Sequence, residues 1–342
     1  MKNSAMTSER DMGVRSQWIN SAVVRRARPL AARLAAAGVL AAALATAQGA
    51  QAGSTPITVG TAGSYGVLVG SGDTLTLGGA FNMSGNLGVG ASSTVNESNN
   101  NSISGTEYKD SGVTTDKTSG TTSISGGTIT QSMSSVISAA TSASAAAKAL
   151  TATSGMTDQG GSISVNGSSV TINALTNLSE NVLNISALSL TNGTLTFNDN
   201  GYTGAKFIVN ITGNFNVSSS GSGKSIIQGI NGASGSDIIF NIENAGSTVS
   251  ITGNSTNALI GTILDPSSSV TLSGGGSLTG AILAGFNNAG KSYTVQDNSS
   301  GFNVTQLGYV ARTTSVPEPP SIALFGAGIA AVAVFARRRR PV

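Results

Sequence analysis

The sequence predicts a mainly β protein, an irregular β-solenoid with one flanking α-helix, and three observations support this prediction. Short runs in which an aliphatic residue alternates with Ser, Thr, Asn or Gly recur through residues 53–311. Their inward positions are small aliphatic residues with Gly close by, which suits the narrow core of stacked rungs. One segment, at about 131–154, instead has helical spacing. Two further helices are expected, a signal helix near the N-terminus and a transmembrane helix near the C-terminus.

The alternating runs are four to six residues long and are bounded by Gly or Asn, which is typical of strands. An ordinary β-sandwich would give similar alternation, so it remains the alternative fold. No strict repeat period is visible, and a solenoid would therefore be irregular. The clearest runs are residues 73–90, 162–173, 188–197, 206–217, 237–253, 261–275 and 277–285.

Composition and charge exclude several classes of function. The chain has 45 Gly in 342 residues, 10 % charged residues, no Cys and no His. Disulfides, Cys-His or Ser-His-Asp sites and the usual zinc sites are therefore unavailable. Residues 53–311 carry six lysines, no arginine and twelve acidic residues, so the basic surface that nucleic-acid binding needs is absent. We expect no cofactor, no metal and no nucleic-acid partner.

Residues 1–52 are expected to be a secretory signal peptide. Basic residues up to Arg33 precede an apolar run at 34–47, and the small residues Ala50 and Ala52 follow it. This order indicates cleavage after Ala52, which would leave Gly53 as the first residue and requires the export machinery as a partner. The alternative is an anchor that stays, although the run is short for a span of roughly 20 residues.

The segment at about 131–154 should form one amphipathic helix along the side of the β-structure. Thr130 or Ser132 could cap its start and Gly155 its end. Its apolar stripe has spacings of three and four and consists of Met133, Val136, Ile137, Ala140, Ala143, Ala147 and Leu150. The segments at 55–59 and 293–310 are candidates to cover the ends of the solenoid.

No catalytic site emerges from the remaining polar residues. The acidic and basic residues of 107–117 suggest a solvated loop, and Asn198 to Gly201 suggest a turn rather than a calcium loop. We therefore expect no enzyme. A polysaccharide-active β-helix enzyme with two converging carboxylates is kept as an alternative.

Several stretches carry a resemblance to known families. Residues 65–77, 84–90 and above all 260–285 (IGTILDPSSSVTLSGGGSLTGAILAG) resemble the choice-of-anchor A surface domains and the ice-binding-like β-helix adhesins. The resemblance covers most of 57–311 and implies a right-handed β-helix flanked by a single α-helix. Ice binding would need Thr-x-Thr pairs on successive rungs. Thr74-x-Thr76, Thr128-x-Thr130 and Thr194-x-Thr196 fit this pattern, but Thr248-x-Ser250, Thr271-x-Ser273 and Thr171-x-Asn173 interrupt it.

The tail at 312–342 combines three parts in a fixed order. Val316, Pro317, Glu318 and Pro319 precede an apolar segment at 321–336, and four arginines follow it, namely Arg337, Arg338, Arg339 and Arg340. Sixteen helical residues span about 24 Å, less than a bilayer core of roughly 30 Å. The three parts resemble the PEP-CTERM sorting signal, which implies recognition of Pro317-Glu318-Pro319 by an exosortase. A plain permanent anchor is the alternative.

Together these features predict an exported surface or matrix protein with three regions: signal peptide 1–52, β-helix ectodomain 53–311 and sorting signal 312–342. The protein would be held in the inner membrane by its tail and then sorted to the cell surface or outside. Its partners would be the export machinery, an exosortase and polysaccharide or other cell-surface components of a biofilm. An ice-binding adhesin is the other alternative function.

Overall fold

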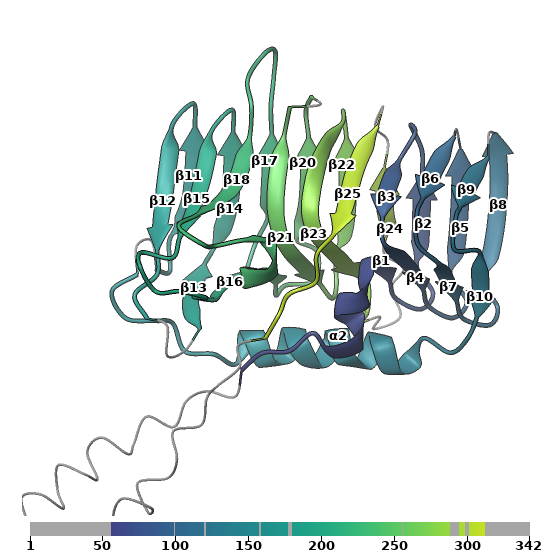
Figure 1. The fold of residues 1–342 in the computed structure, drawn as a ribbon, viewed down its shortest axis with the longest axis horizontal. Coiled ribbons are helices and arrows are strands. Elements are labelled where there is room, and N and C mark those ends of the chain that lie inside the picture. Colours follow the sequence, from purple (N-terminus) through teal and green to yellow (C-terminus); the bar gives the residue numbers. More distant parts are fainter. Residues whose placement is uncertain are drawn as a thin grey trace, which may run out of the picture. The chain divides into compact units, whose positions relative to one another are not determined.

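A computed structural model describes residues 56–311, except 99, 120, 157–158, 177–179, 255, 288–293 and 298–300. The described strands are short and pair in parallel, and they stack into a solenoid with three faces (Figure 1). Their alternating sequences turn every second side chain inward, which explains why three to six residues are enough for all but the two longest strands. The solenoid prediction is confirmed, and the β-sandwich alternative is wrong.

Face 1 of the solenoid is the nine-stranded sheet. In spatial order, its strands are β11 (Ser162–Asn166), β14 (Ala187–Thr191), β17 (Phe215–Ser218), β20 (Thr248–Thr252), β22 (Ser269–Ser273), β24 (Thr294–Asp297), β2 (Thr74–Leu77), β5 (Thr94–Ser98) and β8 (Thr114–Ser119).

Faces 2 and 3 belong to the larger sheet and share two long strands, β21 (Ala258–Asp265) and β23 (Gly276–Ala284). Both strands pass from face 2 into face 3. In β21 this occurs near Gly261, which has a φ of +119° and where a Cβ would lie 2.9 Å from the Phe240 ring. The other strands of face 2 are β12 (Ser169–Asn173), β15 (Thr194–Asn198), β18 (Ile226–Ile230), β25 (Phe302–Gln306), β3 (Asn82–Ser84), β6 (Asn101–Ile103) and β9 (Thr122–Ile124). Those of face 3 are β13 (Asn181–Ile185), β16 (Phe207–Ile211), β19 (Ile238–Ile242), β1 (Tyr65–Val69), β4 (Asn86–Val89), β7 (Glu107–Lys109) and β10 (Thr128–Thr130).

The spatial order of the rungs differs from their order in the sequence. The first rungs stack on the last ones, because β1 pairs with β23, β2 with β24 and β3 with β25. The chain therefore starts in the middle of the solenoid, builds toward one end and crosses to the other end through the helix (Figure 1). It then returns to the middle.

This order makes the prediction for the end caps wrong. Residues 293–310 contribute β24 and β25, which lie inside the stack and pair on both sides. Residues 56–59 lead into the short 3-10 helix η1 (Gly60–Ser64), and Ile57 and Val59 are buried with the helix side of the molecule. Both segments are near the ends of the ectodomain chain, but these ends lie at mid-solenoid.

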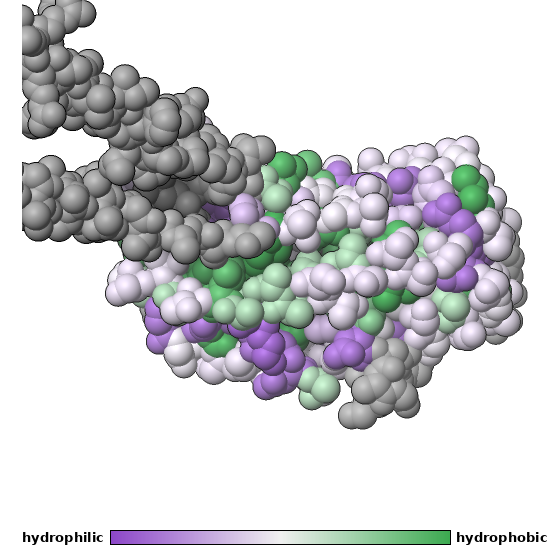
Figure 2. All heavy atoms as spheres, turned by 90° about the horizontal axis from the view of Figure 1, so that it is seen from below, coloured by the Kyte–Doolittle hydropathy of each residue, from purple (hydrophilic) through white to green (hydrophobic). Residues whose placement is uncertain are grey.

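The helix, α2 (Ser134–Lys148), runs along face 3. Its buried residues Val136, Ala140, Ala143 and Ala147 lie in the same cluster as outward side chains of face 3. Alanine lets the helix axis approach the sheet closely, and Figure 2 shows hydrophobic side chains gathered along this side of the molecule. The cluster members on face 3 include Leu68, Val182, Ile208, Ile239, Leu264 and Leu283.

Both ends of α2 differ from the predicted caps. Thr130 belongs to β10, and the N-cap position is Met133, whose N–H donates to Asp110 Oδ2 at 2.8 Å. Ser132 Oγ accepts the Ser134 N–H at 3.3 Å and shares a hydrogen bond with Ser134 Oγ at 3.0 Å, but it is not at the N-cap position. The helix ends at Lys148, well before Gly155, because Thr153 must reach Val182 and donates its N–H to the Val182 carbonyl at 2.9 Å. No helix among the described residues combines the length and apolar character of a membrane span.

Candidate binding face

The outward residues of face 1 are mostly small and polar, and those from β11 to β5 carry no charge. Its inward side chains are the aliphatic core, such as Leu75, Val95 and Val270. From β11 to β5 its outward side chains are Ser, Thr, Asn, Ala and Gln, with no charge and no aromatic ring among them. On the end strand β8 the register places Asp116 opposite the outward Asn96. No described element covers this face, so its hydroxyl and amide groups can contact another surface.

In one row of outward positions on face 1, six neighbouring residues all carry a hydroxyl group. Parallel register places six residues side by side on consecutive strands: Thr248, Ser269, Thr294, Thr74, Thr94 and Thr114. Neighbouring strands are about 4.8 Å apart, so the row is about 24 Å long. Thr114 Oγ1 donates to Thr94 Oγ1 at 3.2 Å, and Ser269 Oγ accepts the Thr294 N–H at 3.1 Å. These contacts order part of the row.

The next row on the same face is mixed. It consists of Ser164, Ser189, Asn216, Ser250, Thr271, Gln296, Thr76 and Asn96, which again follow one register. Hydroxyls and longer amides alternate there irregularly. Face 1 therefore offers one regular line of hydroxyls beside a less regular line of polar groups.

The Thr-x-Thr pairs noted in the sequence do not share a face. Thr74 and Thr76 lie on face 1, Thr194 and Thr196 on face 2, and Thr128 and Thr130 on face 3. They cannot form one grid. The hydroxyl row was missed because its members come from distant parts of the chain and become neighbours only through the rearranged rung order.

Face 2 is less uniform than face 1. Its outward positions include the paired Ile226 and Ala258, and Ile230 is 39 % exposed. Such single aliphatic side chains are common on protein surfaces. Face 2 therefore lacks a continuous row of one chemical kind through its centre.

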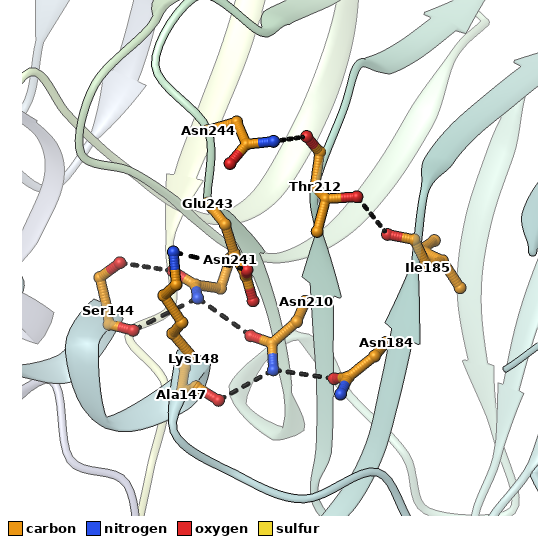
Figure 3. Close-up of polar contacts among 10 residues, drawn as sticks. All are labelled: Ser144, Ala147, Lys148, Asn184, Ile185, Asn210, Thr212, Asn241, Glu243 and Asn244. Atoms are coloured by element: carbon orange, nitrogen blue, oxygen red, sulfur yellow. Dashed lines mark hydrogen bonds and ion pairs between the residues drawn. The ribbon is translucent and has the colours of Figure 1, made fainter. Parts of the chain in front are cut away.

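Face 3 is occupied by α2, which is held by a ladder of asparagines (Figure 3). Asn241 Nδ2 donates to Asn210 Oδ1 at 2.9 Å, and Asn210 Nδ2 donates to Asn184 Oδ1 at 3.0 Å. The helix joins this ladder through Ser144, whose Oγ donates to Asn241 Oδ1 at 2.6 Å, and through the Ala147 carbonyl. The ladder satisfies polar groups beneath the helix, which excludes this face as a free binding surface.

The polar residues singled out in the sequence take part in local packing and turns. Glu107 is not in a solvated loop: it is 1 % exposed, accepts a hydrogen bond from Thr128 Oγ1 at 2.9 Å and lies 3.1 Å from Lys109 Nζ. Asn200, with a φ of +53°, lies in a turn as expected. Within the described ranges, no three carboxylates cluster as metal ligands.

The residues of the two predicted targeting segments lie outside the described residues. These are Ala50, Ala52 and Gly53 at the signal cleavage site, Val316, Pro317, Glu318 and Pro319 of the sorting motif, and the arginines at 337–340. The transmembrane segment 321–336 lies outside them as well.

Two family models match the chain. Residues 32–293 match a family described as an ice-binding-like adhesive domain, and residues 315–340 match the PEP-CTERM protein-sorting motif. No curated protein matches the chain.

Solved structures with a similar fold include three ice-binding proteins. One is from an Antarctic biological consortium (TM-score 0.48, 20 % identity, 75 % of this chain and 94 % of that chain). Another is from the Antarctic ascomycete Antarctomyces psychrotrophicus (TM-score 0.47, 17 % identity, 74 % and 100 %). The third is the DUF3494 domain of a Shewanella frigidimarina ice-binding protein (TM-score 0.45, 17 % identity, 75 % and 99 %).

Proposed function

Because the chain belongs to the family of ice-binding-like adhesive domains and carries a PEP-CTERM sorting motif, we propose that it is an exported surface adhesin that binds through face 1. The partner would be an ordered, uncharged, hydroxyl-rich surface, such as a polysaccharide of the extracellular matrix. The observation that carries this proposal is the hydroxyl row across six consecutive strands of an uncovered face whose outward residues are uncharged from β11 to β5.

The chemistry of face 1 favours hydrogen bonding over other modes of recognition. From β11 to β5 its outward side chains have no aromatic ring to stack on a sugar and no charge to attract an ion. Single hydroxyl contacts contribute little, about 1 kcal/mol each, so useful affinity requires many contacts at once. A rigid row of hydroxyls meets this requirement only against an extended, regular partner.

A pair of matched lysine variants tests this assignment. Thr74→Lys places a long charged side chain in the middle of the hydroxyl row, and Thr305→Lys places the same side chain on face 2. In co-sedimentation with insoluble matrix polysaccharide, Thr74→Lys should bind at least about tenfold more weakly, which is about 1.4 kcal/mol. Thr305→Lys should bind as wild type does. Equal binding by all three proteins would contradict the role of face 1.

Ice is a second candidate surface, and the regularity of the hydroxyl row favours it. The same three proteins should be compared in partition into slowly growing ice. Enrichment of wild type and Thr305→Lys in ice, with exclusion of Thr74→Lys, would identify ice as the surface. If all three proteins are excluded from ice and polysaccharide binding depends on Thr74, ice is not the surface and only the proposal of a polysaccharide-binding adhesin remains.

We also propose that an exosortase processes the tail and that the protein acts without catalysis. Glu318→Ala should stop processing at the sorting motif. Fractionation and intact mass should then find the variant in the membrane with residues 337–342 present, and wild type outside without them. If wild type also keeps these residues in the membrane, the tail is a permanent anchor.

Release of soluble sugars from bound polysaccharide would contradict the proposal that the protein is not an enzyme.

A further inference from the structure

The hydroxyl row on face 1 keeps one spacing over its whole length. Its members stand opposite one another on six consecutive parallel strands, namely Thr248, Ser269, Thr294, Thr74, Thr94 and Thr114. The one register shift in these pairings comes after Glu97, beyond the row. Successive hydroxyls are therefore separated by the strand spacing of about 4.8 Å.

The edge of the row nearest face 3 is lined by small turn residues. The turns before β2, β5 and β8 each carry one small, exposed residue at positive φ, namely Gly72 (76°), Ser92 (59°) and Gly112 (74°). On the other edge lie polar residues of the mixed row, such as Thr76 and Asn96. The row is therefore an open shelf, which can lie flat against a solid surface.

A line of evenly spaced hydroxyls suits a polymer that repeats at the same spacing. In an extended β-1,4-linked glycan, each sugar advances the chain by a length close to the strand spacing of about 4.8 Å. Each Thr or Ser hydroxyl can both donate and accept hydrogen bonds, as sugar hydroxyls do. One hydroxyl of the row would then meet each successive sugar. An α-1,4-linked glycan coils instead, so it would meet the row only at isolated sugars.

From this geometry we propose that face 1 selects polysaccharides by the shape of their chains. It binds insoluble polymers of extended β-1,4-linked chains, with one chain lying along the hydroxyl row and across the strands. Thr74 and Thr94, on neighbouring strands, contact successive sugars. The inference rests on the proposed role of face 1 as the adhesive face, and it adds the linkage and the direction of the bound chain.

The shelf requires a partner that is ordered before it binds. Its outward side chains from β11 to β5 include no aromatic ring and no charge, and each hydrogen bond has a small net effect. A free oligosaccharide loses its own flexibility on binding, which such contacts do not offset. A chain in a solid is already fixed, so the same contacts are sufficient. Soluble oligosaccharides of the same linkage should therefore not compete.

Two solids made of the same sugar test the role of chain shape. Cellulose is a glucan with extended β-1,4-linked chains, and granular starch is a glucan with coiled α-1,4-linked chains. In co-sedimentation, the full chain produced in an exporting host should bind cellulose at least about tenfold more tightly than starch. An excess of soluble cello-oligosaccharide should leave cellulose binding unchanged.

A matched pair of double variants tests the position of the bound chain. Thr74→Val with Thr94→Val removes two neighbouring hydroxyls of the row and keeps the shape of the side chains. Thr171→Val with Thr305→Val removes two exposed hydroxyls from face 2. The face 1 variant should bind cellulose about tenfold more weakly, because two hydrogen bonds are lost together. The face 2 variant should bind as wild type does, and both variants should keep the wild-type melting temperature.

The possible outcomes separate this inference from the proposed function. Equal binding to cellulose and starch, or binding to neither, would overturn the assignment of linkage. If binding to matrix polysaccharide still depended on Thr74, face 1 would remain the adhesive face and the choice of chain shape alone would be wrong. If no polysaccharide binding depended on Thr74, the proposed function would fail as well. Cellulose binding that the face 1 variant leaves intact would overturn the position of the chain on the hydroxyl row.

Discussion

Asp265 lies at the end of β21, and burial disfavours the ionised form of its carboxyl group. It is 0 % exposed, and burial raises the pKa of its carboxyl from 3.8 to about 7. Between these values the folded protein binds a proton that the unfolded chain releases, so stability should fall as pH rises from 3.8 to 7 and then level off. Asp265→Asn removes this titration and should be stabilised relative to wild type above pH 7, by at most about 4 kcal/mol.

Denaturant unfolding of wild type and Asp265→Asn over this pH range measures the effect. Below pH 3.8 the two proteins should be similar, since the wild-type carboxyl is protonated in both states. A stability difference that stays constant over the whole range would contradict the assignment of the titration to Asp265.

Asp110 shows the opposite case. The hydrogen bond from the Met133 N–H is the main reason that the pKa of Asp110 lies below its ordinary value. Its stabilising contribution should be present above pH 3.8 and should disappear as pH falls through the lowered value. Asp110→Asn should therefore be less stable at neutral pH, by about 0.5–1 kcal/mol, as for a carboxylate at a helix N-terminus. Thermal unfolding should show this gap closing in acid, whereas a gap that widens in acid would contradict it.

At the scale of elements, the attachment of α2 depends on the asparagine ladder. Asn241 is 0 % exposed and bonds Ser144 on one side and Asn210 on the other. Asn241→Ala would leave these buried groups without partners, and we expect a loss of about 1–3 kcal/mol. Asn198→Ala is the control, because Asn198 joins a similar but exposed ladder with Asn173 and Asn231 and should cost under about 1 kcal/mol. Equal losses in denaturant unfolding would contradict a special role of the buried ladder.

The predictions from sequence succeeded for elements whose signal is local. Alternation along residues 73–90 or 188–197 follows from the side-chain period of a strand, and the stripe of Val136, Ala140 and Ala147 follows from the helical period. The helix start was placed wrongly because the group at its N-terminus, Asp110, comes from a loop more than twenty residues earlier. The hydroxyl row was missed for the same reason, since register between Thr74 and Thr294 is set by the whole stack.

At the scale of the whole molecule, the described ectodomain is closed by strands near its C-terminus. β24 and β25 lie between rungs made early and rungs made late in the chain. The early rungs, β1 to β10, pair with one another, but the side of β1, β2 and β3 that faces mid-solenoid has no partner until β23, β24 and β25 are in place. The described solenoid should therefore reach its native state only after residue 306 is available, which favours folding after export rather than during it.

This arrangement predicts where the solenoid weakens first. Phe302 in β25 is 0 % exposed, and Phe302→Ala should cost about 3–5 kcal/mol through the cavity it leaves. Because β25 joins β23 to β3, the loss should increase hydrogen exchange in β2 to β6 more than in β14 to β17. Phe215→Ala in β17 removes an equally buried ring away from the junction. It should increase hydrogen exchange in β14 to β17 more than in β2 to β6. If Phe302→Ala leaves exchange in β2 to β6 unchanged, the early rungs are stable without the junction, and the dependence of their folding on β25 is contradicted.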